Sequence, residues 1–286
     1  MSDKISIIIP SDFTDVSAVA IKNALALKKS SPLNLTIFHV VNNLVLDNIK
    51  HNRTSMDNIT MKLGQTEDEL RSIPDLSVIT KISEGSIFHS ISREAAEQKA
   101  DFVFLGSHGV KSVQHIVGGF ISLIIQKLNC GVMVSQSKAV GPEGFKKIFV
   151  LVDSWDRINK YADLVTKLAK IAGSEIYLQP FSYTNPILNH QVHSHTSAVS
   201  QVFSGAGIPC TVAPNPVSNL DDAIDNAVKY GADVIATNME ENRKIILGDD
   251  QSDLLNNPHQ VPVYCINNYT ESMIDSIGNV YPFNYI

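Results

Sequence analysis

A glycine-rich stretch, LGSHGVKSVQHIVGGFIS, occupies residues 105–122 directly after an apolar run. Because glycine has no Cβ, the backbone at Gly106 and Gly109 can approach a phosphate closely, and successive N–H groups there can hold an anion. Gly119 opens a helical segment whose free N–H groups also favour anions. The pattern predicts a phosphate-binding loop, although tight turns between a strand and a helix would also explain these glycines.

Two other side chains of this loop bear on how well it could grip a phosphate. Phe120 stands where a hydroxyl would be expected, and its ring would occupy phosphate space. Ser122 could supply a hydroxyl two positions later, or it could be an ordinary serine near the start of a helix. We therefore predict that a nucleotide phosphate binds weakly or not at all at this loop.

Short β-branched runs alternate with helical periods on both sides of the loop. Uninterrupted apolar strands that are separated by helices are typical of a parallel sheet covered on both faces. In such a doubly wound sheet, ligands bind at the carboxyl ends of the strands. We expect strands at 5–10, 34–41, 76–82, 101–105 and 131–135, and helices at 14–29, 54–72, 87–98 and from the glycine-rich loop to about 129, with a loose Asn-rich stretch before residue 54.

The same order of segments restarts after residue 146. KIFVLVD at 147–153 echoes residues 4–12, and GADVIAT at 231–237 echoes KADFVFLG at 99–106, so that Asp101 and Asp233 occupy the same place. We interpret this pattern as an internal duplication of about 140 residues. The fold class is then α/β, with two tandem doubly wound parallel five-stranded sheets flanked by helices.

The duplication gives a prediction for the domains and for the elements of the second half. We expect a first domain at 1–137, a linker at 138–146, a second domain at 147–268 and an Asn/Tyr-rich tail at 269–286. In the second domain we expect strands at 147–153, 175–179, 210–213, 231–237 and 261–266, and helices at 161–172 and 220–230.

Composition narrows the class of protein. The 286 residues carry a net charge of −6, which gives no support to binding of nucleic acid or of a membrane surface. No apolar window approaches the ~18 residues of a membrane span. Cys130, Cys210 and Cys265 form no Cys-x-x-Cys pair and lie at apolar runs, so we expect buried reduced thiols and a cytoplasmic protein.

Other chemical motifs are few. The segment NHQVHSH contains His190, His193 and His195, and it is typical of a polar loop running into a helix, so we predict no metal site there. The chain has no Walker loop and no Gly-x-Ser-x-Gly elbow. We therefore predict no catalytic residue, and the sequence favours a protein that is not an enzyme.

The first half resembles the universal stress protein family. The resemblance rests on IIIPSDFTDVSAVAIKNALAL, NLTIFHVV, ADFVFLGSHG and LNCGVMVS, which follow one another at the family's spacing across residues 1–137. The second half resembles the family more faintly, through KIFVLVDS, GADVIAT and VPVYCI. The chain thus looks like a tandem, two-domain member, whose fold would be Rossmann-like, of the adenine nucleotide alpha hydrolase type.

The resemblance implies roles for particular residues. The family's nucleotide signature matches Gly106, Gly109 and Gly119 at the right spacing, but it continues with Ser or Thr where this chain has Phe120. By the same resemblance, Pro10 and Asp12 follow the first strand at the adenosine site and Val41 flanks the base. From its position alone Asp12 could equally be the N-cap of the helix near Thr14, and Val41 could simply end a strand.

The second half lacks this signature. Where the first half has GSHG, the second has TNMEEN at 237–242, in which Glu240 and Glu241 place negative charge where phosphates would lie. Asp153 is the counterpart of Asp12. We predict no nucleotide in the second domain.

Two functions of different classes follow. The preferred one is a non-enzymatic stress-response protein that binds a ligand or a protein partner, with its domains packed as an internal pseudo-dimer. Family dimers commonly pair their fifth strands, and the candidates here are 131–135 and 261–266; a homodimer of the whole chain would be a further step. The alternative is an ATP-binding switch with slow hydrolysis in the first domain. A third reading is a less charged ligand stacked on Phe120.

Overall fold

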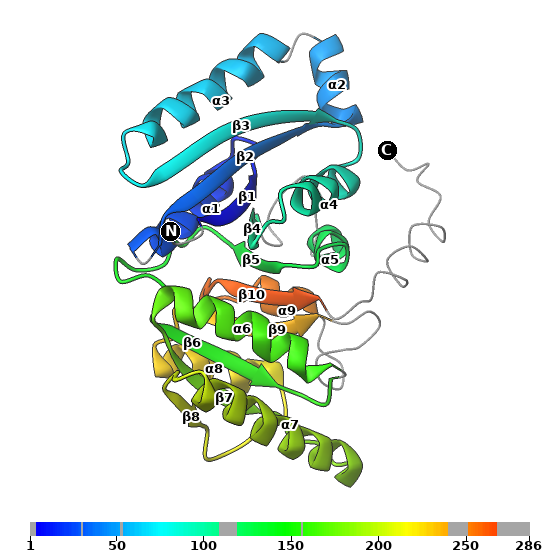
Figure 1. Cartoon of the computed structure of the whole chain (residues 1–286). Coiled ribbons are helices and arrows are strands. Elements are labelled where there is room, and N and C mark those ends of the chain that lie inside the picture. Colours follow the sequence, from blue (N-terminus) through cyan, green and yellow to red (C-terminus); the bar gives the residue numbers. More distant parts are fainter. Residues whose placement is uncertain are drawn as a thin grey trace.

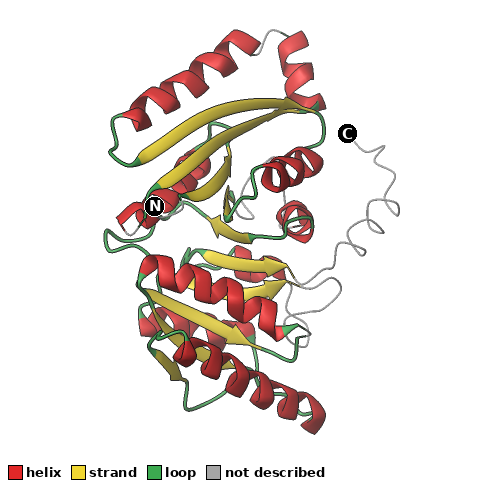
Figure 2. Cartoon of the chain, in the orientation of Figure 1, coloured by secondary structure: helices red, strands yellow, loops and turns green. Residues whose placement is uncertain are grey.

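The computed structural model describes residues 4–29, 31–51, 54–108, 119–155, 157–239 and 251–267. Ten strands form a single sheet that runs through the middle of the molecule, with helices packed against it (Figures 1 and 2). The C-terminal tail and the segment TNMEEN from Glu240 onward lie outside the described residues, so the predictions made for them stay predictions.

The first five strands are all parallel and lie in the order β3-β2-β1-β4-β5. Their bounds are β1 Ile5–Pro10, β2 Leu33–Val41, β3 Leu76–Glu84, β4 Phe102–Gly106 and β5 Gly131–Ser135. The structure therefore confirms the five strands expected from the sequence. They could be predicted because runs of buried β-branched residues are a strong local signal for a strand.

The second five strands repeat this order as β8-β7-β6-β9-β10, again all parallel. Their bounds are β6 Lys147–Val152, β7 Glu175–Pro180, β8 Cys210–Val212, β9 Val234–Met239 and β10 Val263–Asn267. β5 and β10 pair antiparallel and join the two sets into one sheet, so the two fifth strands pair as expected. The fold class is thus α/β, with two doubly wound five-stranded sets.

The helices lie on both faces of the sheet. Neighbouring residues of β3 show this directly, since Thr80 donates a hydrogen bond to Glu67 of α3 and Lys81 pairs with Glu94 of α4. Successive side chains of a strand point to opposite faces, so α3 and α4 cover opposite faces. The bounds are α1 Asp15–Ala26, η1 Leu27–Lys29, α2 Asn43–Lys50, α3 Met56–Arg71, α4 Ile87–Glu97, α5 Gly119–Gln126, α6 Ile158–Ala172, α7 Pro186–Gly205, α8 Leu220–Tyr230 and α9 Gln251–Leu255.

Two helices were misjudged from the sequence. The Asn-rich stretch expected to be loose forms α2, whose N-cap Asn42 accepts a hydrogen bond from the Val45 N–H. The segment with three histidines lies inside α7, which begins at Pro186 behind the N-cap Asn185, so the expected polar loop is wrong. Each helix begins at a side-chain cap, and α7 also has a proline in its first turn. Both helices therefore start before their apolar patterns become clear.

The echo between the two halves has a structural counterpart. Asp101 Oδ2 accepts a hydrogen bond of 2.8 Å from the Ser6 N–H, and Asp233 Oδ2 accepts one of 2.9 Å from the Lys147 N–H. In each half, the aspartate before the fourth strand thereby fixes the start of the first strand. Asp101 also receives the Lys167 ammonium at 2.5 Å, which links the first half to α6 of the second.

The cysteines differ in their exposure. Cys265 is buried in β10, as expected, whereas Cys130 and Cys210 remain partly exposed, so full burial of those two was wrong. The thiol of Cys130 is nevertheless desolvated, and this burial raises its pKa to about 12. All three are free thiols. No helix among the described residues is both long and apolar enough to cross a bilayer.

The contact between β5 and β10 depends on a glycine. Tyr264 of β10 is fully buried, and its hydroxyl donates to the Leu164 carbonyl of α6 at 3.2 Å. A Cβ added to Gly131 would lie 1.9 Å from the Tyr264 hydroxyl oxygen and 2.4 Å or less from two ring carbons. Gly131 therefore makes room for the tyrosine that fills the junction.

Replacing Gly131 with alanine is expected to lower the free energy of unfolding by about 1–3 kcal/mol, since the buried ring of Tyr264 must shift to admit the methyl group. Gly64→Ala is the matched control, because an added Cβ there meets nothing within 4 Å and the site lies inside α3. The control should gain about 0.5–1 kcal/mol. Urea denaturation measures both, and equal stability of the Gly131 variant and wild type would contradict this account.

Candidate functional site

The residues predicted to bind a ligand converge at the carboxyl ends of β1 and β4. The strand order passes from β2 and β1 to β4, so the chain reverses direction across the sheet at this point. Crevices outside such switch points are the usual ligand sites of open α/β sheets. Pro10 ends β1 and Asp12 follows it, while Gly106 ends β4 next to Ser107 and His108.

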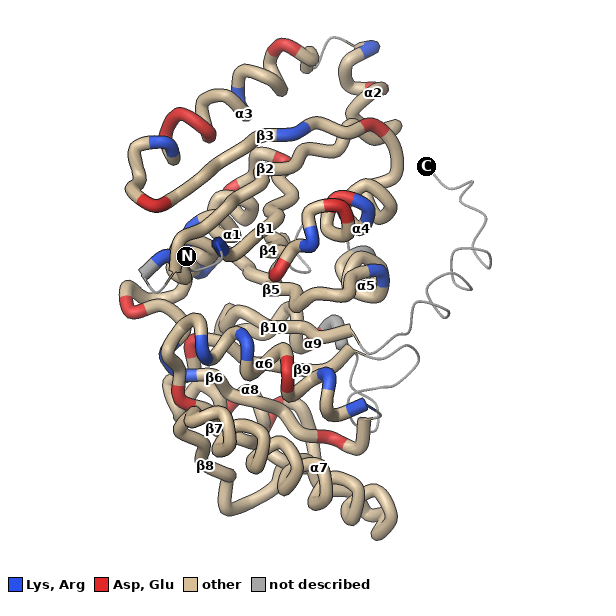
Figure 3. Tube along the Cα trace, viewed as in Figure 1, with Lys and Arg blue, Asp and Glu red and all other residues tan. Residues whose placement is uncertain are grey.

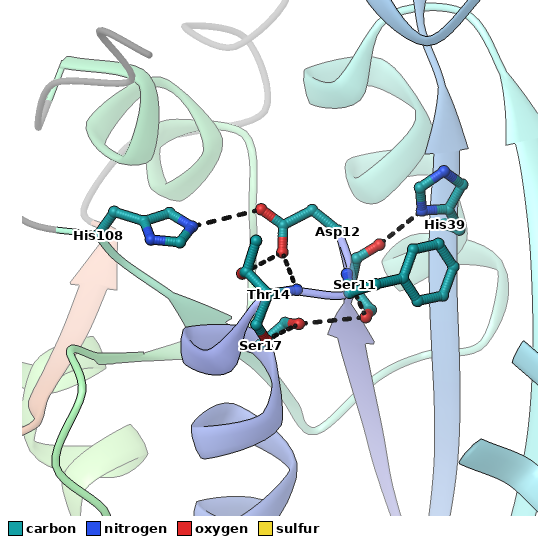
Figure 4. A network of polar contacts seen from close by, with 7 residues as sticks. Ser11, Asp12, Thr14, Ser17, His39 and His108 are labelled. Carbon is teal, nitrogen blue, oxygen red and sulfur yellow. Dashed lines mark hydrogen bonds and ion pairs between the residues drawn. The ribbon is translucent and has the colours of Figure 1, made fainter. Parts of the chain in front are cut away.

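Asp12 is accessible and holds the start of the β1–α1 loop. Its Oδ1 accepts hydrogen bonds from the N–H and the hydroxyl of Thr14, at 3.1 and 2.5 Å, and its Oδ2 lies 3.5 Å from His108 Nε2 (Figure 4). The side chain is 55% exposed, so a ligand can reach the carboxylate. The N-cap of α1 is Thr14, and the expected capping by Asp12 is wrong because Asp12 lies two residues too early.

Three further residues line this loop, and they were not singled out from the sequence. The Ser11 hydroxyl lies 3.3 Å from that of Ser17, which donates to the Thr14 carbonyl at 2.8 Å. His39 Nδ1 lies 2.7 Å from the Ser11 carbonyl oxygen (Figure 4). The one available signal was the polar histidine inside the apolar run NLTIFHVV.

Gly106 is needed for the packing of α1 against β4. A Cβ on this residue would lie 2.5 Å from the carbonyl carbon of Val16 and 2.8 Å from the nitrogen of Ser17. The backbone of α1 therefore rests directly on the end of β4. This close approach of a helix explains why residue 106 is a glycine. Neither a bound ligand nor a tight turn is needed to explain it.

The remaining predicted residues are placed less favourably or are not described. Val41 is fully buried, and its carbonyl accepts the Gly85 N–H at 3.1 Å, so a base could meet its side chain only if the packing moved. Gly119 is the first residue of α5, and Ser122 lies one turn into that helix, partly buried. Gly109 lies outside the described residues. The ligand roles of these residues stay predictions.

The equivalent switch point of the second half is occupied by side chains. Asp153 is 3% exposed, and its Oδ1 accepts the Ser154 N–H at 2.5 Å and the Tyr183 hydroxyl. Eight residues after Asp12 stands Ala20, whereas eight residues after Asp153 stands Tyr161.

The larger side chains of the second half occupy the switch point itself. The Tyr161 hydroxyl lies 2.9 Å from the carbonyl oxygens of both Leu151 and Ala236, between β6 and β9. Trp155 is 2% exposed and packs edge-on against Tyr161, with ring centroids 5.3 Å apart. Five residues after the aspartate that precedes the fourth strand, the first half has Gly106 and the second has the buried Asn238.

The three histidines singled out from the sequence all lie in α7. His195 Nδ1 lies 2.8 Å from the Asp153 carbonyl oxygen, and the helix carries no Lys, Arg, Asp or Glu (Figure 3). Within the described part of the chain, no group of three or more His, Cys, Asp or Glu side chains is arranged to hold a metal ion.

A pocket lies at the opposite edge of the second set of strands. It has a volume of about 550 Å³ and is lined by Lys147, Glu175 and Pro209 at the amino ends of the second set of strands. Its Lys146 ammonium already donates to the carbonyl of Ala172 at 2.6 Å. Because open α/β sheets bind ligands at the opposite, carboxyl edge, we place the candidate site at Asp12 and not in this pocket.

Comparison with known proteins agrees with this architecture. The family model of the universal stress protein family matches residues 6–136. No curated protein sequence matches the chain. Among solved structures, a universal stress protein from Archaeoglobus fulgidus is similar over 92% of this chain and 98% of its own, with a TM-score of 0.68 and 19% identity.

Other solved structures are similar at lower identity. A putative universal stress protein from Pseudomonas aeruginosa covers 96% of each chain, with a TM-score of 0.58 and 15% identity. A universal stress protein family protein from Arabidopsis thaliana with AMP bound is 16% identical and covers 47% of this chain and 93% of its own, with a TM-score of 0.35. The family match, the doubly wound sheet and the glycine pattern agree, so residues 6–136 form a domain of the universal stress protein family.

Proposed function

We propose that the chain is a non-enzymatic, ligand- or partner-binding member of its family, in which only the first half keeps a crevice that admits a ligand. The observation that carries this proposal is the contrast between the two aspartates at equivalent places. Asp12 is 55% exposed, whereas Asp153 is 3% exposed and is bonded to Tyr183. A nucleotide would have to displace Tyr161 and Trp155 to enter the second half.

Adenine nucleotides are proposed to bind the first half weakly. Asp12 supplies an accessible carboxylate, but the residue after Gly119 is Phe120, which provides no hydroxyl for a phosphate. Calorimetric titration with ATP and AMP tests this directly. A sub-micromolar dissociation constant would contradict weak binding and would favour the second candidate, an ATP-binding switch with slow hydrolysis in the first half.

A simpler experiment separates the two candidates. The purified protein is denatured, and the supernatant is analysed for adenine nucleotide by absorbance and mass spectrometry. The proposed function predicts no stoichiometric nucleotide, because weakly bound ligand is lost during purification. Release of close to one nucleotide per chain would instead support the switch.

The two halves are proposed to act as an internal pseudo-dimer of universal stress protein domains in the cytoplasm. The pairing of β5 with β10 supports this, since it leaves only β3 and β8 as edges of the described sheet. A protein partner or a second copy of the chain would bind outside this junction. Sedimentation equilibrium distinguishes a monomeric chain from a homodimer.

A further inference from the structure

A buried histidine lies behind the candidate crevice, with one nitrogen that has no partner. His39 is 6% exposed and sits near the carboxyl end of β2. Its Nδ1 lies 2.7 Å from the Ser11 carbonyl oxygen, and because a carbonyl only accepts, Nδ1 carries the hydrogen. Nε2 is then a bare acceptor, and it has no hydrogen-bond partner among the described residues.

The β1–α1 loop is fastened to this ring by an aromatic stack. The rings of Phe13 and His39 lie 4.7 Å apart between centroids at an angle of 26°. Phe13 has a φ of 63°, a left-handed conformation that a bulky residue adopts only when its surroundings enforce it. The Phe13 N–H also donates a hydrogen bond of 3.2 Å to Ser11 Oγ. The stack and this hydrogen bond together hold the strained backbone of Phe13 in place.

The charges around His39 are few and opposed. Asp12 favours a proton on the ring, and Lys62 of α3, whose ammonium lies 5.3 Å from the centroid of the Phe13 ring, disfavours it. The partner of His39 on β3, Ile82, is uncharged. The other charged side chains of α1, α2, β3 and the facing part of α3 are exposed or paired elsewhere: Asp15, Lys22, Asp47, Lys50, Asp57, Glu67, Lys81 and Glu84.

We propose that the Phe13–His39 stack is a pH-sensitive latch that holds the β1–α1 loop closed while His39 is neutral and releases it when His39 is protonated. A proton on Nε2 would create a buried N–H without an acceptor and a buried cation that can gain water only by leaving its place. When the ring leaves, Phe13 loses its stacking partner and its strained conformation relaxes. The loop that carries Asp12 then moves, whether or not a nucleotide binds.

The direction of the pH dependence follows from burial. Burial is the main cause that lowers the pKa of His39, with Lys62 acting in the same direction and the Ser11 carbonyl and Asp12 acting against it. A histidine whose pKa falls in the closed state binds fewer protons there, so closure loses stability as the pH drops below about 6.5. Between that value and the lowered pKa, the open population rises about tenfold per pH unit.

Hydrogen exchange of the loop tests the latch. The amides of Phe13 and Thr14 donate to Ser11 and Asp12, and their exchange, corrected for its intrinsic pH dependence, should accelerate from pH 7.5 to pH 5 in step with the NMR titration of the His39 ring. In His39→Gln this pH response should vanish. The control is His195→Gln, which removes a histidine bonded to the main chain of Asp153 in the second half, and it should keep the wild-type response.

A second variant covers the case in which His39→Gln does not fold. Lys62→Gln removes the cation that opposes protonation, so opening should begin at a higher pH than in wild type. An unchanged midpoint in this variant would overturn the latch. The latch would also be overturned if the corrected exchange rate of the loop stayed the same at every pH while the His39 ring titrates. A His39→Gln protein that keeps the wild-type pH response would overturn it as well.

Discussion

Replacing Gly106 with alanine is expected to lower the free energy of unfolding by at least about 3 kcal/mol, at the upper end of the cost of overpacking. The added methyl group would lie 2.5 Å and 2.6 Å from the carbonyl carbon and oxygen of Val16. Both are main-chain atoms, which cannot turn aside as a side chain can. Either α1 or the end of β4 would have to move.

The helix that would have to move is held at several points. Asn23 is fully buried, donates to the Ser135 hydroxyl at 2.8 Å and accepts the Val140 N–H at 2.8 Å. Val16 and Ala20 on the same helix are buried. Retreat of α1 would loosen all of these contacts together, which is why we expect a large effect.

The matched control is Gly141→Ala. An added Cβ at Gly141 meets nothing within 4 Å, so its stability should stay within about 0.5 kcal/mol of wild type. Urea denaturation followed by circular dichroism compares the three proteins. If Gly106→Ala unfolds at the same urea concentration as the control, the close approach of α1 does not constrain this position.

This result bears on how ligand experiments at Gly106 are interpreted. A Gly106 variant that loses nucleotide affinity would do so through displacement of α1 even if no ligand atom touched the glycine. Binding tests therefore belong at another position, and Phe120 is the one at which the chain departs from the family's nucleotide signature.

Replacing Phe120 with serine is expected to tighten ATP binding roughly 10- to 150-fold. Phe120 is the second residue of α5, so a hydroxyl there would stand in the first turn, beside N–H groups that have no partner within the helix. A hydrogen bond to a charged phosphate contributes about 1.5–3 kcal/mol, which corresponds to this range of affinity.

Phe120→Ala separates the two parts of this effect. The alanine removes the ring without adding a hydroxyl, so any increase in ATP affinity over wild type measures the effect of the space that the ring occupied. The further increase in affinity of Phe120→Ser over Phe120→Ala measures the effect of the hydrogen bond. Isothermal titration calorimetry with ATP and AMP measures both variants. A serine variant that binds no more tightly than wild type would mean that the missing hydroxyl is not what limits affinity.

Much of the architecture could be predicted from local patterns. Ile5–Pro10 and Gly131–Ser135 were located to the residue, because short buried strands rich in β-branched residues differ sharply from the amphipathic periods between them. The whole of α2 and the early start of α7 were missed, since both helices begin in polar, Asn-rich segments whose helical state depends on caps and not on periodicity.

The candidate site was predictable only in part. The glycine pattern and Asp12 both indicated one edge of the sheet, and the structure brings Asp12 and Gly106 together there, because both follow strands whose carboxyl ends meet at that edge. Val41, which was expected beside a base, is buried, and His39 was not singled out at all. A strand pattern predicts that a residue is buried, but it does not predict which side chain from elsewhere in the chain packs against it.

The sequence by itself determined the order of the strands, the repetition of that order in the second half and the edge of the sheet where Asp12 and Gly106 meet. These depend on hydrophobic periodicity and on residues near one another in the chain. Only the tertiary structure decided that Gly106 serves the packing of α1, that Gly131 leaves room for Tyr264 and that Tyr161 occupies the second crevice. Each is a contact between residues distant in sequence, and such contacts are fixed by the close packing of the whole interior, which no local pattern encodes.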